Sequence, residues 1–147
     1  MTVRVQQDRF DLGAEVQGFA QGCNTSGAVV NFTGIVRNTP DGDLDRMEIE
    51  HYPGMTQSAL AEIEAKAVKR WSLKGSLIIH RYGILRPGDM IMMVATAAPH
   101  RVDAFESAQY LMDYLKSRAP FWKKEFTTDG HQWVEAKDAD EAALTRW

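Results

Sequence analysis

The chain has 147 residues, of which 44% are hydrophobic and 25% are charged, and its formal net charge is −3. This composition is typical of one globular domain over residues 1–147 and lacks the broad basic surface that nonspecific nucleic-acid binding requires. No apolar run approaches the roughly 20 residues that span a bilayer, and the N-terminal stretch lacks the apolar core of a signal peptide. We therefore expect a cytoplasmic protein.

The N-terminal part of the chain predicts a strand, a helix and a second strand. Val3 and Val5 alternate with polar residues, which is typical of a short strand. An apolar stripe then ends near Gly22, where we expect a helix to end. Residues 27–37 are rich in β-branched side chains and predict a second strand. Gly34 in its interior indicates a bulge or a close approach of another backbone.

The middle of the chain predicts a hairpin and a second helix. Residues 38–45, NTPDGDLD, have the composition of a surface turn and are the segment that we expect to be most flexible. Residues 47–52 alternate between apolar and polar side chains, so we predict that they return as the second strand of a hairpin with residues 27–37. A helix should follow from Thr56 to Trp71, with Thr56 as its candidate N-cap.

The later strands complete the predicted fold. Residues 76–84 and 90–97 are apolar, strand-like runs separated by the turn sequence LRPGD. Residues 130–136 could supply one more strand, and residues 138–147 a short helix or a mobile tail. Because helices interrupt the strands while hairpin-like neighbours also occur, we predict a mixed α+β fold and not a regularly wound parallel sheet.

A cationic corner follows the third long helix, which should begin near Arg101. Its apolar residues recur at helical spacing, at Val102, Phe105, Ala108, Met112 and Leu115. Pro120 should end the helix, because the residue before a proline avoids helical geometry, and residues 121–126 should then leave as a strand. Four cationic side chains surround this corner: Lys116, Arg118, Lys123 and Lys124. On an acidic chain, this local excess predicts a site for an anion.

Lys116 is the best candidate for chemistry at this corner. Partial burial or a cationic neighbour can lower the pKa of a lysine enough for acid-base work. The spacing fits equally well with a surface pair between Lys116 and Asp113. Lys123 and Lys124 point to opposite faces of an extended segment, so at most one should face the same pocket as Lys116. Solvation of both is the simpler interpretation.

Other residues offer weaker anion-binding signals. Arg37 ends a predicted strand beside a loop, and His100 and Arg101 lie at a helix start, where free backbone N–H groups favour anions. Capping or surface roles fit these positions equally well. From the residues alone, the chain is therefore a compact domain with a small-anion pocket.

Cysteine and histidine usage narrows the chemistry. Cys23 is the single cysteine, which excludes an internal disulfide and a cysteine-rich zinc site. A packing role is favoured for Cys23, although a reactive thiol stays open. The four histidines lack metal-ligand spacing, and common phosphate-loop, dinucleotide and hydrolase motifs are absent from the sequence. We expect neither a metal nor a cofactor.

A series of strings, in order, resembles the catalytic (large) subunit of molybdopterin synthase, the MoaE family. They are NFTGIVRN, EHYPGMT, IIHRYGILRPGD, the block from His100 through YLMDYLKSRAPFWKKE, and WVEAKD. The resemblance covers about Gly27 to Lys137. It implies an α/β hammerhead-type fold with an additional antiparallel sheet.

The resemblance also implies an activity and a partner. The family is a sulfurtransferase that converts cyclic pyranopterin monophosphate to molybdopterin by installing a dithiolene. The sulfur would arrive as a thiocarboxylate on the C-terminal Gly-Gly tail of a small ubiquitin-like subunit, and the tail would enter the pocket. The assembly would be a homodimer carrying one small subunit at each end, a heterotetramer.

Particular residues acquire roles by this resemblance. Lys116 would be the principal catalytic lysine, in proton transfer or charge stabilisation, and Lys123 the second pocket lysine. The pterin phosphate would be held by these lysines with Arg37, His100 and Arg101, the last two reaching across the dimer interface. The channel for the partner's tail would be lined by Phe32, Met112 and Pro120.

Three positions depart from the family pattern. Lys137 and Lys124 stand where arginine is frequent, and Tyr82 replaces a more usual aliphatic residue. Lysine keeps the charge but loses the planar fork of arginine, so a bidentate phosphate contact at Lys137 stays open. Two other functions compete with sulfur transfer: a noncatalytic receptor for a ubiquitin-like tail, and a phosphate-binding module without a protein partner.

Overall fold

The computed structural model, described over residues 1–135 and 137–147, arranges its strands in two sheets. The first sheet has the order β1 (Thr2–Gln6), β4 (Gly75–Arg81), β6 (Met90–Ala98) and β2 (Ala28–Ile35). The second has the order β5 (Gly83–Leu85), β3 (Arg46–His51), β7 (Phe121–Thr127) and β8 (Gly130–Trp133). β1 runs parallel to β4, and the other pairings between these strands are antiparallel.

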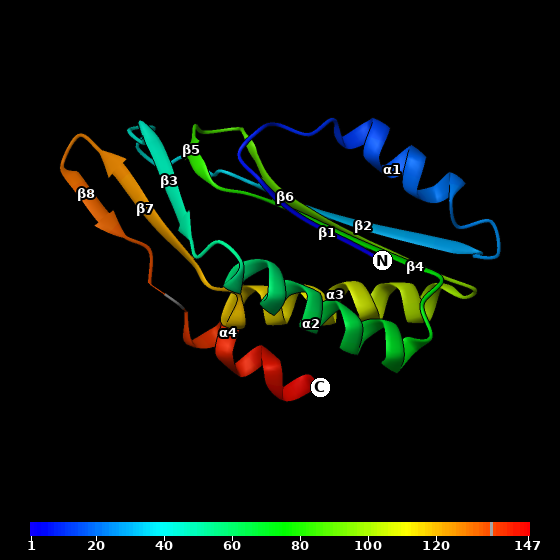
Figure 1. Cartoon of the computed structure of the whole chain (residues 1–147). Coiled ribbons are helices and arrows are strands. Elements are labelled where there is room, and N and C mark those ends of the chain that lie inside the picture. Colours follow the sequence, from blue (N-terminus) through cyan, green and yellow to red (C-terminus); the bar gives the residue numbers. More distant parts are fainter. Residues whose placement is uncertain (136) are drawn as a thin grey trace.

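Three helices cover the two faces of the first sheet: α1 (Leu12–Gln21), α2 (Met55–Trp71) and α3 (Arg101–Arg118). A fourth helix, α4 (Asp138–Ala143), packs against α3 and continues into the 3-10 turn Leu144–Arg146. Figure 1 shows α1 on one face and α2 with α3 on the other, while the second sheet lies beyond one end of the first. In the described part of the chain, no helix has the length and apolarity that crossing a bilayer requires. The predicted mixed α+β fold is confirmed.

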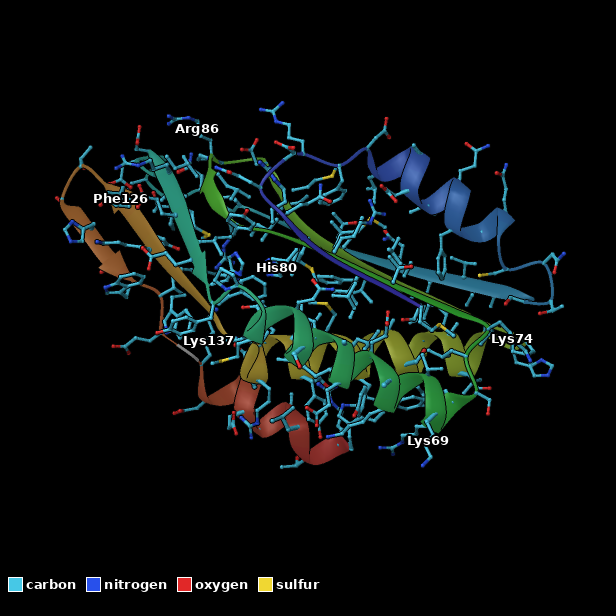
Figure 2. The ribbon with its side chains drawn as sticks, in the orientation of Figure 1. Lys69, Lys74, His80, Arg86, Phe126 and Lys137 are labelled. Atoms are coloured by element: carbon cyan, nitrogen blue, oxygen red, sulfur yellow. The ribbon has the colours of Figure 1, made fainter. Side chains whose placement is uncertain are left out.

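β4 is buried along its whole length because helices pack on both of its faces. Leu77 and Ile79 belong to the cluster under α1. Ile78 belongs to the larger cluster with residues of α2 and α3. Since side chains alternate along a strand, His80 shares the face of Ile78, and Figure 2 shows it at the junction between the two sheets.

The predicted boundary between α3 and β7 is confirmed. α3 ends at Arg118, Ala119 is extended with φ −76° and ψ 132°, and β7 begins at Phe121. The predicted bulge at Gly34 is also confirmed, because the pairing of β2 with β6 shifts register between Gly34 and Ile35. These features depend on local backbone sterics, which a short stretch of sequence expresses directly.

The predicted buried face of α3 is wrong at its start. Val102 and Phe105 are 58% and 62% exposed. The buried face consists mostly of small or slender side chains, namely Ala104, Ser107, Ala108, Tyr110, Leu111 and Leu115. Small residues allow α3 to approach β6 closely, and the Thr96 hydroxyl donates to the Ala104 carbonyl over 2.7 Å.

The predicted hairpin between residues 27–37 and 47–52 is wrong. β2 pairs with β6, whereas β3 pairs with β5 and β7 in the other sheet. The predicted single strand over residues 76–84 is also two strands, because Gly83, with φ +91°, turns the chain from β4 into β5 of the second sheet. Alternating side chains predict a strand but not its partner, which tertiary packing selects.

The predicted N-cap of α2 is wrong as well. Gly54 precedes the helix, and no side chain caps it. Thr56 is fully buried; its hydroxyl accepts the Tyr52 N–H over 3.1 Å and donates to the Pro120 carbonyl over 3.4 Å. Thr56 therefore joins the start of α2 to the corner before β7.

The C-terminal segment folds back onto α3. Of the strand predicted over residues 130–136, β8 forms only Gly130–Trp133, and Ala136 lies outside the described residues. Helix α4 follows, as one of the two predicted alternatives. The Trp147 indole donates to Asp113 over 2.7 Å, and Arg118 pairs with Glu141 over 2.7 Å. These contacts hold α4 and the C-terminal residue against α3.

Candidate functional site

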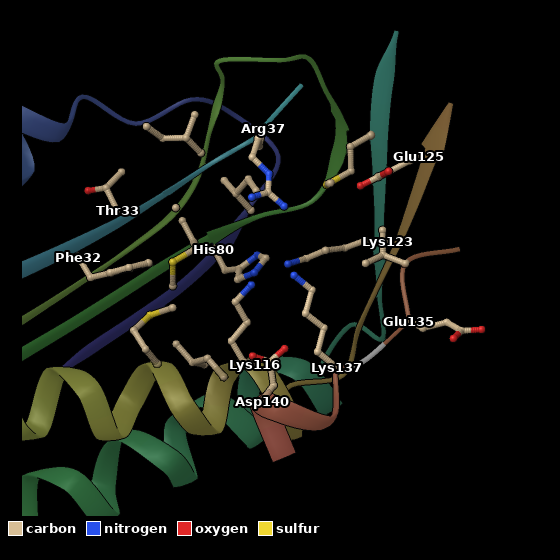
Figure 3. A pocket seen from close by; sticks show the side chains of 18 residues that line it. Phe32, Thr33, Arg37, His80, Lys116, Lys123, Glu125, Glu135, Lys137 and Asp140 are labelled. Carbon is tan, nitrogen blue, oxygen red and sulfur yellow. The ribbon is translucent and has the colours of Figure 1, made fainter. Parts of the chain in front are cut away.

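A cavity of about 460 Å³ lies where the two sheets meet α3 and the C-terminal segment. Its lining side chains come from β2 and the residues just after it, from β3, β4, β6, α3 and β7, and from residues 134, 135, 137 and 140. Its ionisable lining residues are Arg37, His80, Lys116, Lys123, Glu125, Glu135, Lys137 and Asp140. Figure 3 shows the three lysines and Arg37 directed into a common space around His80.

The cavity gathers four cationic side chains from four parts of the chain. Arg37 follows β2, Lys116 lies near the end of α3, Lys123 is in β7, and Lys137 precedes α4. A concave surface of one charge sign raises the local concentration of ions of the opposite sign. Of the four cations that the sequence placed at the corner, Lys116 and Lys123 line the cavity, whereas Arg118 pairs with Glu141 and Lys124 lies outside the lining.

Lys123 is the electrostatically perturbed lysine of this group. Burial and the nearby positive charge of Lys116 lower its pKa from 10.5 to about 8, while the carboxylate of Asp140 acts in the opposite direction. With that pKa, roughly a tenth of the Lys123 amines are neutral at pH 7. Lys123 can therefore both hold and release a proton near neutrality.

Lys116 approaches the cavity from the helix. Asp113, its predicted surface partner, is instead bonded to Trp147 over 2.7 Å and paired with Arg146 over 3.3 Å. The alternative of a Lys116 to Asp113 surface pair is not found among the described residues. Lys116 is exposed, so its ammonium group stays accessible to a ligand that enters the cavity.

The two adjacent lysines of β7 point in different directions, as their spacing predicted. Lys123 lines the cavity. The ammonium of Lys124 lies 5.5 Å from the Phe126 ring centroid and 5.1 Å from that of Trp133. The interpretation that both lysines are solvated is therefore wrong for Lys123.

Only some of the other predicted site residues lie at the cavity. Phe32 and Met112 line the cavity, whereas Pro120 lies outside its lining and its carbonyl accepts the bond from Thr56. His100 and Arg101 are exposed at the opposite end of α3, about four helical turns or roughly 22 Å from Lys116. Within one chain, they do not meet the lysines.

Sequence reasoning did not assign His80, Glu125 or Asp140, although all three line the cavity. The position of Glu125 in the cavity was predictable from the sequence, because Glu125 lies two residues after Lys123 in a strand and so shares its face. For His80 the sequence offered a weaker indication, a histidine inside an apolar run. For Asp140 it offered no indication, because only the folding back of the C-terminal segment brings this residue near Lys123.

Cys23 lies elsewhere, outside the lining of this cavity. A methyl group added at Gly75 would come within 2.4 Å of the Cys23 sulfur, so the thiol packs against the backbone at the start of β4. This contact fits the packing role that the sequence favoured. In the described part of the chain, no cluster of three or more histidine, cysteine or acidic side chains could hold a metal ion.

Comparison with known proteins identifies the family. The family model described as MoaE protein matches residues 5–118. The chain belongs to the MoaE family. A relative from Cereibacter sphaeroides, named molybdopterin synthase catalytic subunit, is 60% identical over 147 residues, with 100% of both chains covered.

Solved structures of the family share this fold. The molybdopterin biosynthesis MoaE protein from Burkholderia ambifaria has a TM-score of 0.83 and 51% identity, with 100% of this chain and 98% of that chain covered. Molybdopterin synthase from Staphylococcus aureus has a TM-score of 0.79 and 30% identity, with coverage of 90% and 96%. The fold expected from the family resemblance is confirmed.

Proposed function

We propose that the chain is the catalytic subunit of a molybdopterin synthase. It transfers sulfur from the C-terminal thiocarboxylate of a small ubiquitin-like subunit to cyclic pyranopterin monophosphate, forming the dithiolene of molybdopterin. The observation that carries the proposal is the four-cation cavity in a chain of the MoaE family. A curated relative that matches the whole chain has the name of this enzyme.

The charge of the cavity suits both reactants. A thiocarboxylate and a phosphate are anions, and the cavity offers them Arg37 and three lysines. Fixed cations in a partly enclosed site stabilise developing negative charge more strongly than mobile water does. Arg37 and Lys137 are assigned to the phosphate, with Lys116 and Lys123 at the reacting groups.

The two lysines have complementary roles in this proposal. Lys116 stabilises the negative charge that develops on the acyl oxygen during transfer. Lys123, with its pKa lowered to about 8, holds and returns a proton. Each transfer exchanges a sulfur of the carrier for an oxygen, so the carrier returns as a carboxylate, and two transfers complete the dithiolene.

The partner's tail would pass between apolar walls. Phe32 and Met112 line the cavity together with Gly34. A methyl group at Gly34 would lie 3.3 Å from the Met92 side chain, so the glycine keeps this wall open for a narrow tail. A Gly-Gly terminus is the least bulky peptide that such a channel could select. Pro120 belongs to the proposed channel through family resemblance alone.

We place His100 and Arg101 at the site of the other protomer in a homodimer, within a heterotetramer. Both residues are exposed, and Val102 and Phe105 beside them form an apolar surface that a second copy could cover. Residues 1–147 act as one domain in this proposal, because one core cluster contains residues from both sheets. A cytoplasmic location is part of the proposal, since the relatives are named for bacterial cofactor biosynthesis.

The decisive experiment uses the purified chain, the thiocarboxylated partner and cyclic pyranopterin monophosphate, with molybdopterin as the measured product. The wild type should form product, and Lys116→Ala should lose it while still forming a complex on size-exclusion chromatography. Lys124→Ala is the matched control, because that lysine lies on the other face of β7. Unchanged product formation by Lys116→Ala would overturn the catalytic role of Lys116. A wild type that binds the partner without forming product would support the noncatalytic receptor, and the absence of any complex would support the phosphate-binding module.

A further inference from the structure

We propose that His80 is a positioning residue for the sulfur-transfer site: its neutral imidazole donates from Nδ1 to the backbone and accepts, at Nε2, a hydrogen bond from the Lys123 ammonium. This bond would hold the Lys123 amine at the reacting groups. The inference rests on the proposed function for its catalytic meaning, but the hydrogen-bond arrangement can be tested without turnover.

The tautomer follows from one contact. Nδ1 of His80 lies 2.7 Å from the carbonyl oxygen of Arg81. A carbonyl oxygen can only accept, so Nδ1 carries the proton of this bond. In a neutral imidazole, Nε2 then has a free lone pair and acts as an acceptor.

The ring is held firmly in one orientation. His80 is 5% exposed and stacks on Phe121, with ring centroids 3.7 Å apart and an interplanar angle of 13°. Phe121 precedes Lys123 by two residues in β7, so the two side chains share a face of the strand. The residue that supports the ring is therefore on the same strand face as the lysine that the ring would orient.

The His80 ring lies among hydrogen-bond donors. His80 lines the cavity, and Figure 3 shows its ring with the ends of Lys116 and Lys123 directed toward it and Arg37 on the other side. These neighbours carry N–H groups and positive charge and have no acceptor of their own. An acceptor lone pair among three cations is a natural partner for a lysine ammonium.

The surroundings keep His80 neutral. Burial is the largest cause, and the charge of Lys123, with smaller effects of His51 and Lys116, acts in the same direction, lowering the pKa of His80 to about 3. A neutral acceptor has an advantage over a carboxylate here. It can orient the lysine without repelling an anionic thiocarboxylate, and it raises the lysine pKa less than a carboxylate would.

Two substitutions separate the hydrogen bond from packing. His80→Phe can keep the stack on Phe121 but removes the acceptor, whereas His80→Gln places an amide oxygen near the position of Nε2. For the loss of one hydrogen bond to a charged group, we expect kcat to fall at least about tenfold in His80→Phe, with an unchanged KM for the carrier subunit. His80→Gln should recover most of kcat. A His80→Phe variant that folds and keeps kcat within about twofold of the wild type would overturn the proposal, as would a Gln variant no better than Phe.

A measurement on the unmodified protein keeps the inference testable if these variants do not fold. ¹⁵N NMR of the histidine side chains should show His80 with a protonated Nδ1 and an unprotonated Nε2 between pH 5 and 8. The opposite tautomer, or an imidazolium in this range, would overturn the proposal. Because this readout needs no substrate, its failure is distinct from failure of the proposed function, which would appear as wild-type protein that makes no molybdopterin.

Discussion

Lys116 and Lys123 enter the same cavity from opposite sides of the corner at Pro120, one from the end of α3 and the other from β7. The corner is short because α3 ends at Arg118 and β7 begins at Phe121. The positive charge of Lys116, together with burial, lowers the pKa of Lys123. The two lysines therefore form an electrostatically coupled pair.

This coupling predicts how the pKa of Lys123 responds to its neighbours. In the wild type, Lys123 should titrate near pH 8 and not near 10.5. Lys116→Met should raise its pKa, because a repelling charge is lost, and Asp140→Asn should lower it, because an attracting charge is lost. NMR titration of labelled lysine side chains measures both. A wild-type Lys123 that titrates with the surface lysines would contradict the coupling.

The proposed sharing of sites across a dimer predicts complementation. Arg101→Ala and Lys116→Ala should each reduce product formation in homodimers. When the two variants are co-expressed, half of the dimers should be mixed, and each mixed dimer should contain one intact site. Total activity should then recover to about a quarter of the wild-type level by statistical mixing. If both residues served a site within one chain, mixing would restore nothing.

Lys137 should contribute to substrate binding more than to the chemical step. It lines the cavity, and its side chain is directed into the space that Lys116 and Lys123 also enter. We expect Lys137→Met to raise KM for the pterin substrate by about tenfold or more, the size of one lost charge-assisted hydrogen bond, with a smaller change in kcat. Lys137→Arg should bind at least as tightly as the wild type. Steady-state kinetics distinguishes these outcomes, and an unchanged KM in Lys137→Met would exclude the contact.

Glu64, which lies outside the cavity lining, should make the free energy of unfolding depend on pH. It is 5% exposed, accepts a hydrogen bond from Ser76, and its pKa is raised above 4.5, chiefly by burial. The folded state therefore retains this proton at pH values where the unfolded state has released it. Stability from this group is fully present below pH 4.5 and is lost as pH rises through the folded-state pKa.

Glu64→Gln removes that dependence and tests it. Relative to the wild type, the variant should gain unfolding free energy at pH 8 compared with pH 5, as measured by urea denaturation. Glu62→Gln, on the exposed face of α2, is the matched control and should show little change. A wild type that becomes more stable relative to Glu64→Gln as pH rises would have the opposite sign and refute the assignment.

Local patterns predicted the elements well where short-range sterics decide them. Pro120 ended α3 and started β7 at the expected positions, and Gly34 marked the bulge in β2. The alternation of side chains along β7 also predicted that at most one of the two adjacent lysines faces the cavity. The function was predicted from the sequence strings that resemble the MoaE family, because these strings include the residues around that corner in the family's order.

Tertiary structure decided which segments pair and what converges on the cavity. β3 has an alternating pattern that fits either sheet, and only packing places it beside β5 and β7. His80 and Asp140 lie far from Lys123 in the sequence, and they reach it because β4 meets β7 and the C-terminal segment folds back onto α3. Periodicity reports which face of an element is apolar, but contacts between distant segments depend on the energy of the whole packed core. The sequence by itself thus determined the local elements and the family, and the fold decided the surroundings that tune the lysines.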